Sequence, residues 1–452
     1  MSQTKPIQDS TSNPQPDLTS KQLYSNYVLN QRQNVPIIYG NINFTSPPER
    51  FTTASDVKTQ LSEEFISEKE RLLADEEMVM MMRNYTMTGD QTSDAYAALI
   101  PEYGFLKINQ MLEVAVKSGI DAVDNPPQEL REFISEMEAI PEWLDMELIE
   151  KGAVQTRIVF AFLAPFTIRG ALIATFLNKY TALPMAITGA FSSATSAKRI
   201  KETGSFFAAT IMPRALERHG DGFLAAAKVR LMHSMVRFNI ILTGKWDDTI
   251  YGVPIPQSDQ MPAGMLGIYL MAQDVIKSGR TEFTPEERAR AELYRYRCFL
   301  LGLPESLLET NPQRIIDLWL TRSATLRDEF EDATCGNLIR STLEADLTND
   351  NSFKGRLHKW MERGFFKMYF VKSFMNNNYN RAAQLGIKTN LNNKIAAIVT
   401  LIWIFGNIKL FKVLDKSIFK NRAERFIIKK MQKLLESYGH AEFVTDARRY
   451  NA

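Results

Sequence analysis

The stretch Lys228-Val-Arg-Leu-Met-His-Ser-Met-Val-Arg237 places one histidine between two arginines. At helical spacing Arg230, His233 and Arg237 stand at i, i+3 and i+7, so one imidazole and two guanidinium groups share a helix face. Neutral imidazole is a common iron ligand, and arginine pairs well with carboxylates such as the two propionates of haem. The arrangement is therefore suited to a haem held by His233.

The alternative is that this histidine is a solvated residue or a helix cap. The chain contains four histidines, and no second metal-binding side chain lies beside His233 in the sequence. A lone histidine among arginines satisfies no metal-site pattern by spacing alone.

The composition is that of a globular protein with a large core. Of the 452 residues, 45% are hydrophobic and 23% are charged, enough for one large domain or two ordinary ones. The segment Lys409–Lys433 holds nine Lys or Arg against Asp415 and Glu424, a charge of +7, which leaves about −5 elsewhere from the total of +2. Any anionic partner is therefore expected at the C-terminus.

Two cysteines, Cys298 and Cys335, provide neither a disulfide framework nor a Cys-x-x-Cys site, which fits a reducing compartment. Residues 1–22 are rich in Ser, Thr, Gln and Pro and contain no apolar run of the kind found in signal peptides. We therefore expect an intracellular, cytoplasmic protein, with a possible peripheral membrane association.

Residues 1–52 are polar and contain six prolines, which predicts a flexible arm. Its one apolar run, Ile37-Ile38-Tyr39, is compatible with a short strand. From Thr53 onward helical periodicity dominates, and neither a G-x-G-x-x-G nor a G-x-x-x-x-G-K-[ST] motif occurs, which disfavours dinucleotide-binding and P-loop folds.

Two apolar stretches raise the question of a membrane. The run 158–177 is interrupted by Pro165 and Arg169, which favours a kinked helix in the core over a membrane span. Residues 395–408 are uncharged, but 14 residues are short against the roughly 20 needed to cross a bilayer. The basic, amphipathic segment that follows is typical of a helix on a membrane surface, and equally of a terminal helix packed on the core.

Several short sequence blocks follow one another between about residues 140 and 305. They are Pro141-Glu-Trp-Leu-Asp145, Glu150-Lys-Gly152, Arg199-Ile-Lys-Glu-Thr203, Lys228 to Arg237, Lys245-Trp-Asp247, Tyr251-Gly-Val-Pro-Ile-Pro-Gln-Ser-Asp259 and Tyr294-Arg-Tyr-Arg-Cys-Phe-Leu-Leu-Gly-Leu-Pro304. This ordered set resembles the latex-clearing protein and mycophenolic-acid-pathway oxygenase family, the haem-containing group also described by its rubber oxygenase catalytic domain.

The resemblance implies a role for each matching residue. His233 would be the proximal ligand of the haem iron, and Arg230 and Arg237 would pair with the propionates. Arg199 and Thr203, four residues apart on one helix face, would lie on the distal side as catalytic residues. The alternative for all four polar neighbours of the ligand is an exposed or capping residue.

The chain departs from the family pattern in three respects. The residue before Thr203 is Glu202, where the family leads us to expect lysine, so a carboxylate reverses the local charge and becomes a candidate catalytic residue itself. The lysine that can close over the iron has no matching motif here, although Lys107 and Lys117 lie in the corresponding part of the chain. The family's upstream acidic residue has no counterpart in 182–190.

These observations predict an all-α, globin-like haem-binding domain over residues 53–385 and a basic amphipathic helical extension over 386–452. The function expected is that of an oxygenase with haem b, dioxygen and an apolar isoprenoid or fatty-chain substrate, cleaving a carbon–carbon double bond. Rubber itself is not expected, and neither is a nucleic-acid partner. The competing hypothesis is a non-enzymatic helical protein that binds anionic membranes and whose histidine is structural.

Overall fold

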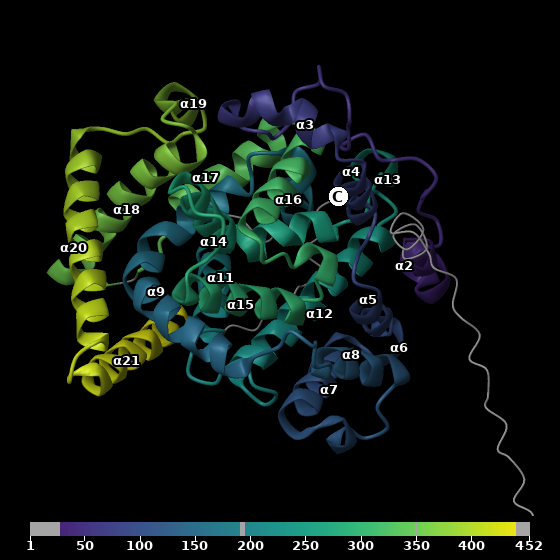
Figure 1. Cartoon of the computed structure of the whole chain (residues 1–452). Helices are drawn as coiled ribbons and strands as arrows, with labels where there is room; N and C mark the ends of the chain where they lie inside the picture. Colours follow the sequence, from purple (N-terminus) through teal and green to yellow (C-terminus); the bar gives the residue numbers. More distant parts are fainter. Residues whose placement is uncertain (1–27, 190–194, 349, 440–452) are drawn as a thin grey trace, which may run out of the picture.

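The computed structural model describes residues 28–189, 195–348 and 350–439 (Figure 1). Within these ranges the protein is built from helices, and the only β-structure consists of two isolated bridges, Phe51 with Leu326 and Thr59 with Arg327. The prediction of an all-α fold is therefore confirmed. The globin-like arrangement within that class stays a prediction.

A first helix covers residues 28–34. The elements that follow are α2 (Pro36–Tyr39), the 3-10 turn η1 (Glu63–Glu68), α3 (Lys69–Ala74), α4 (Glu76–Thr86), α5 (Gln91–Ala97), α6 (Ile100–Tyr103), α7 (Phe105–Ser118), η2 (Ile120–Ala122), α8 (Gln128–Glu138), α9 (Met146–Ala174), α10 (Lys179–Ile187), α11 (Ser196–Ala209), α12 (Asp221–Leu242), α13 (Asp248–Tyr251), α14 (Gln257–Lys277), α15 (Pro285–Leu300), η3 (Glu305–Leu307), α16 (Pro312–Thr325), the π-turn η4 (Asp332–Gly336), α17 (Asn337–Glu344), α18 (Phe353–Phe374), α19 (Tyr379–Gln384), α20 (Leu391–Asp415) and α21 (Lys420–Tyr438).

Helix α9 is the central element of the fold. It begins where the Asp145 side chain accepts hydrogen bonds from the amides of Glu147 and Leu148, and it continues through Pro165 to Ala174. It packs against α15 on one side and α18 on another, with α11, α20 and α21 also in contact (Figure 1). This burial supports the expected core helix.

The α9–α15 contact is unusually close at Gly152. A Cβ atom at this position would lie 2.1 Å from the carbonyl oxygen of Ala289 and 2.6 Å from its carbonyl carbon. The obstacle is backbone rather than a flexible side chain, so glycine alone allows this helix spacing.

The N-terminal arm predicted for residues 1–52 is wrong from residue 28 onward. Val35, Ile38 and Tyr39 are buried, and Ile37-Ile38-Tyr39 lies in helix α2, not in a strand. Arg50 is also buried and forms an ion pair with Asp259, in which Nη2 of Arg50 donates to both carboxylate oxygens. The sequence misled because the partners of these side chains lie far along the chain.

The C-terminal helices share the main core. Helix α20 buries one stripe that includes Thr400, Ile404 and Ile408, and α21 buries Ala423, Ile427 and Met431. The apolar members of both stripes belong to the same hydrophobic cluster as α9. Residues 391–438 are thus packed onto the domain, as the core-packing alternative expected.

The α9–α15 contact provides a stability test. Gly152→Ala should lower the free energy of unfolding by about 1–3 kcal/mol, because the added methyl group overlaps the Ala289 backbone. Gly406→Ala is the matched control, since its Cβ would meet nothing within 4 Å, and helix propensity predicts a gain of roughly 0.5–1 kcal/mol. Urea unfolding measures both; equal behaviour of the two variants would contradict the close packing.

Candidate functional site

Helix α12, which carries His233, is held by two buried arginine clusters. Arg230 is 2% exposed, and its Nε and Nη2 donate to the two carboxylate oxygens of Asp90 at 2.5 and 2.8 Å. The same Nη2 donates to Glu136 Oε1 at 2.6 Å. The Arg230 guanidinium is therefore neutralised by two carboxylates of the protein.

Arg237 is fully buried two helical turns further on. It forms an ion pair with Asp94, which also accepts a hydrogen bond from the Tyr39 hydroxyl. Its Nε and Nη2 donate to the carbonyls of Pro254 and Ile255 at 2.9 and 2.8 Å. Burial and then the Asp94 charge raise the pKa of the Tyr39 hydroxyl well above its usual value, so Tyr39 remains a donor.

These contacts bear on two expectations for Arg230 and Arg237, an exposed or capping position and a role as propionate partners. Neither residue is exposed or caps a helix, so that alternative is wrong for both. Their assignment as propionate partners stays a prediction, and it is weakened because each guanidinium already contacts a carboxylate of the protein. Their role is to fix the position of α12.

His233 lies between the two arginines and points toward α14. Its Nδ1 is 3.0 Å from Oε1 of Gln260. Gln260 is oriented in turn by Gln257, whose Oε1 is 3.5 Å from Gln260 Nε2 and whose own amide nitrogen donates to the carbonyls of Gly89 and Gly302 at 3.0 and 3.1 Å.

This amide chain determines the histidine tautomer. The NH₂ group of Gln257 donates to two carbonyls, so its oxygen is the atom that accepts from the NH₂ group of Gln260. The side-chain oxygen of Gln260 is then the atom that faces His233. The proton therefore sits on Nδ1 of His233, and Nε2 keeps its lone pair. That is the state required of an imidazole metal ligand whose second nitrogen is fixed by a neighbouring acceptor.

The charge state of His233 agrees with this geometry. Burial, and to a smaller extent the positive charge of Arg237, lower the pKa of His233 to about 4, although the Gln260 hydrogen bond acts in the opposite direction. The imidazole is consequently neutral near pH 7.

Helix α11 packs against α12 and α9 and carries the three predicted catalytic residues. Arg199 Nη1 donates to Glu202 Oε2 at 2.8 Å, and the Thr203 hydroxyl donates to the Arg199 carbonyl at 3.0 Å. Glu202 is buried and Arg199 is 23% exposed. The structure thus brings the three together, and the carboxylate beside Thr203 partly neutralises the arginine.

The other candidate residues lie elsewhere. Nδ1 of His219 is 3.0 Å from the Val116 carbonyl, and His440 lies outside the described residues. Lys107 is exposed, and Lys117 forms an ion pair with Glu113 on the outer face of α7. In the described ranges, no group of three or more His, Cys, Asp or Glu side chains is placed to hold a metal ion.

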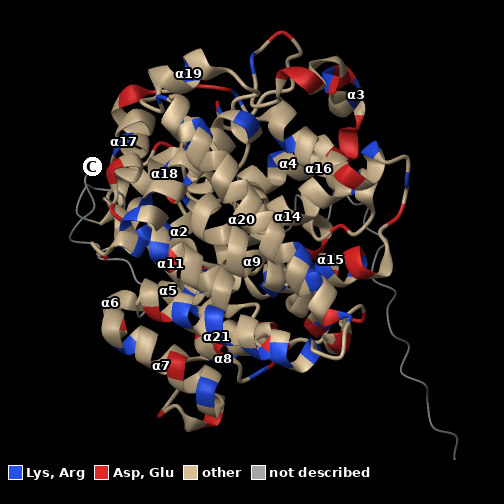
Figure 2. Ribbon diagram, turned by 90° about the vertical axis from the view of Figure 1, so that its left-hand side faces the viewer, with Lys and Arg blue, Asp and Glu red and all other residues tan. Residues whose placement is uncertain are grey.

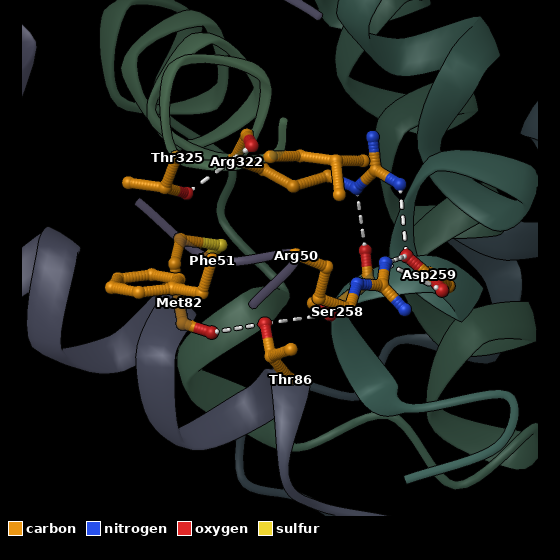
Figure 3. A pocket seen from close by; sticks show the side chains of 9 residues that line it. Arg50, Phe51, Met82, Thr86, Ser258, Asp259, Arg322 and Thr325 are labelled. Carbon is orange, nitrogen blue, oxygen red and sulfur yellow. Dashed lines mark hydrogen bonds and ion pairs between the residues drawn. The ribbon is translucent and has the colours of Figure 1, made fainter. Parts of the chain in front are cut away.

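A small cavity of about 10 Å³ lies away from α11, between α4, α14 and α16 (Figure 3). The guanidinium groups of Arg50 and Arg322 both point at the carboxylate of Asp259, which holds the pKa of Asp259 below its usual value. The volume is that of about one water molecule. The ion pairs around the cavity hold the N-terminal segment in place, and the cavity is too small for a cofactor.

Part of this chain matches a known protein family. Residues 158–365 match the family model described as "ER-bound oxygenase mpaB/B'/Rubber oxygenase, catalytic domain". The matched segment includes α11, α12 and α14, and so contains His233 and Gln260, whereas the carboxylates Asp90, Asp94 and Glu136 lie outside it. This segment therefore matches the catalytic domain of an oxygenase family, as the sequence blocks predicted.

One solved structure supports the fold. The structure titled "Structure of Latex Clearing Protein LCP in the closed state" superposes with a TM-score of 0.54 at 17% sequence identity, and the alignment covers 78% of this chain and 91% of that chain. At this identity the likeness extends to the helical fold. Among curated proteins, no relative matches the chain.

Sequence reasoning missed Gln260 and the carboxylates Asp90, Asp94 and Glu136. Gln260 directly follows the block that ends at Asp259, so its proximity to that block was a usable signal. The carboxylates stand 140, 143 and 94 residues away from the arginines they neutralise, and no local pattern connects them.

The buried Arg237–Asp94 pair is expected to affect the free energy of unfolding. Arg237→Met should destabilise the protein by about 3–5 kcal/mol, because it leaves Asp94 charged and unpaired in the core. Adding Asp94→Leu should recover much of that loss. Arg214→Met, in an exposed pair with Glu217, is the control and should leave chemical unfolding unchanged. A variant Arg237→Met that is as stable as the control would contradict the anchoring role.

Proposed function

We propose that this oxygenase binds one b-type haem through Nε2 of His233 and oxidises an apolar substrate with dioxygen. The observation that carries the proposal is the neutral imidazole of His233, whose Nδ1–H is fixed by Gln260 and whose Nε2 lone pair is left for iron. The family match over 158–365 supports the same chemistry. When bound, such a haem supplies dioxygen activation.

The residues of the chain have distinct parts in this proposal. Gln260 sets the tautomer and orientation of His233, and Arg230 and Arg237 fix the helix that carries it. On the neighbouring helix α11, Arg199, Glu202 and Thr203 provide a guanidinium, a carboxylate and a hydroxyl oxygen that orient polar atoms at the reacting centre. Thr203 acts mainly as an acceptor, because its proton is used by the Arg199 carbonyl.

The substrate class is an isoprenoid or fatty chain, and the reaction is oxidative cleavage of a carbon–carbon double bond. One alkene and one dioxygen give two carbonyl products, so the balance needs no external reductant. Support comes from the family resemblance and from the large apolar surface described below.

We also propose that α20 and α21 rest on an anionic membrane surface. Ten large apolar side chains of α20 are exposed, namely Leu391, Ile395, Ile398, Val399, Leu401, Ile402, Trp403, Phe405, Leu410 and Val413. Isolated exposed apolar residues are ordinary, but a contiguous face of this size marks an interaction site.

The neighbouring charge supports lipid as the proposed partner. In Figure 2 the α20 face is mainly free of charge, whereas basic residues lie along α21 beside it. Lys420, Arg422, Arg425, Lys429 and Lys433 are all exposed on that helix. An apolar strip flanked by cations matches acyl chains and anionic headgroups together.

By length and composition, α9 and α20 each could cross a membrane, and their most apolar windows are 50% and 22% buried. The burial of α9 is that of a core helix. Helix α20, at 25 residues, is longer than the uncharged stretch suggested, but its buried stripe ties it to α18 and α9. These contacts favour a helix lying in the membrane interface over one that crosses it.

The haem proposal is tested on purified full-length protein expressed with haem supply. His233→Ala should lose the Soret band while its far-UV helical signal remains, and Gln260→Leu should lower haem affinity about 10- to 100-fold by releasing the imidazole. His219→Ala is the control and should retain full occupancy, because that side chain contacts the Val116 carbonyl of α7. Full occupancy of His233→Ala would refute the assignment.

The lowered pKa of His233 predicts how haem responds to acid. A folded pKa of about 4, below the ordinary value near 6.5, means that the unfolded chain binds this proton first, so stability falls as pH drops through that window. Haem affinity should stay constant from pH 7 to about pH 5 and fall only near pH 4 or below. Soret absorbance and far-UV circular dichroism at each pH separate release from unfolding; release centred near pH 6.5 would be inconsistent with a buried neutral ligand.

The membrane proposal is tested by flotation with phosphatidylserine-containing vesicles. The triple variant Ile398→Ser, Ile402→Ser, Phe405→Ser should lose binding, because it removes apolar area from the exposed face without touching the buried stripe. Leu106→Ser with Ile140→Ser, at exposed sites on other elements, is the control. Wild-type binding should weaken with salt, since the basic part is screened. A triple variant that floats like wild type would exclude α20 as the contact.

A further inference from the structure

Arg297 is a buried arginine without an anion. It is 3% exposed, and its Nε is enclosed and has no hydrogen-bond partner. Throughout the described ranges, no hydrogen bond or ion pair of this side chain is found; its guanidinium lies 4.8 Å from the ring centroids of Phe207 and Tyr294. The faces of two aromatic rings are its nearest negative potential.

The other arginines that are equally buried show what is missing. Each of them pairs with a carboxylate: Arg50 with Asp259, Arg157 with Glu150, Arg169 with Glu362, Arg230 with Asp90 and Arg237 with Asp94. Arg297 is the exception among the described residues with this burial. A guanidinium does not lose its proton in a protein, so its burial is unfavourable until an anion arrives.

The position of Arg297 identifies which ligand would bring that anion. Phe207, over which the guanidinium lies, follows Arg199 and Thr203 at eight and four residues, so the three share one face of α11. Helix α15, which carries Arg297, packs against α14, the helix of Gln260, and against α12, the helix of His233. Helices α14 and α15 are in direct contact, and the side-chain contact of Arg297 with Phe207 connects α15 to α11.

Two glycines of α14 permit this approach. A Cβ on Gly264 would meet Cys298 Sγ at 2.4 Å, and one on Gly267 would meet the Tyr294 ring at 2.6 Å. Cys298 and Tyr294 flank Arg297 on its helix, so these glycines set how near the guanidinium is to the helix that orients His233.

We propose that Arg297 is the carboxylate-binding residue of the haem site and pairs with a haem propionate. It thereby takes the role that the sequence assigned to Arg230 and Arg237, both of which are neutralised inside the protein. The guanidinium fork suits a carboxylate in two parallel hydrogen bonds. This inference rests on the proposed haem function. The carboxylate of a fatty substrate has the same chemistry and is the other possible source.

The first measurement is the stability of the protein without haem. Arg297→Leu should raise the thermal midpoint of the haem-free protein, because it removes an uncompensated buried charge, whereas a structural arginine would lower it when replaced. Arg288→Leu is the control on the same helix, since Arg288 is 52% exposed. A lowered midpoint specific to Arg297→Leu would overturn the proposal.

The second measurement is haem affinity by Soret titration of the full-length protein with haem and with haem dimethyl ester. Arg297→Leu should bind haem about 10-fold or more weakly than wild type, in the range of a charge-assisted hydrogen bond, and Arg297→Lys should recover part of the loss. Wild type and Arg297→Leu should bind the ester equally, because the ester carries no propionate charge. Arg288→Leu should match wild type with both.

The outcomes separate the two proposals. Wild-type protein that binds neither haem nor its ester would reject the haem function itself. Wild type that binds haem, with Arg297→Leu weakened equally for haem and ester or weakened for neither, would overturn the role of Arg297 alone. If haem affinity is unchanged and palmitate perturbs the Soret band of wild type but not of Arg297→Leu, the carboxylate belongs to a fatty substrate and the propionate assignment is wrong.

Discussion

The neutralisation of Arg230 and Arg237 by carboxylates from α5, its N-cap and α8 is the interaction on which the rest of the site depends. The two arginines are seven residues apart, so they fix both the rotation and the height of α12, and His233 between them can face only α14. The cost of burying two guanidinium groups is offset because each has a carboxylate in direct contact. The amide chain of Gln257 and Gln260 then determines which imidazole nitrogen is free.

The buried arginines therefore divide into two kinds. Most are paired within the chain and stabilise the arrangement of helices, as Arg169 and Glu362 do between α9 and α18. Arg297 has no such partner among the described residues, and we propose that its charge is left for a ligand. A protein interior that satisfies its charges this consistently makes an unsatisfied one informative about what binds there.

The apolar side chains of α20 are likewise divided between the core and the outer surface. Helix α20 uses one stripe to complete the core around α9 and leaves its opposite face to the outside. The helices that carry the candidate catalytic residues and the surface proposed to meet lipid thus belong to one packed unit. An apolar substrate dissolved in a bilayer would first contact α20 and α21. Both of these helices contact α9, and α21 also contacts α11.

The sequence by itself determined the helical class and the match to the oxygenase family, because each depends on local spacing. The placement of His233 between Arg230 and Arg237 is a property of ten consecutive residues, and the ordered blocks identified the family without knowledge of their contacts. The predicted core helix at Pro165 was recovered for the same reason.

Only the tertiary structure decided what each charge does. The arginines were assigned to propionates because their carboxylates lie more than 90 residues away along the chain, and Tyr39 was placed in a flexible arm because Asp94, its partner, is 55 residues distant. The exceptional position of Arg297 is visible only after every acidic side chain around it has been placed. A local pattern gives the charge of a residue, whereas its partner depends on how distant segments fold together.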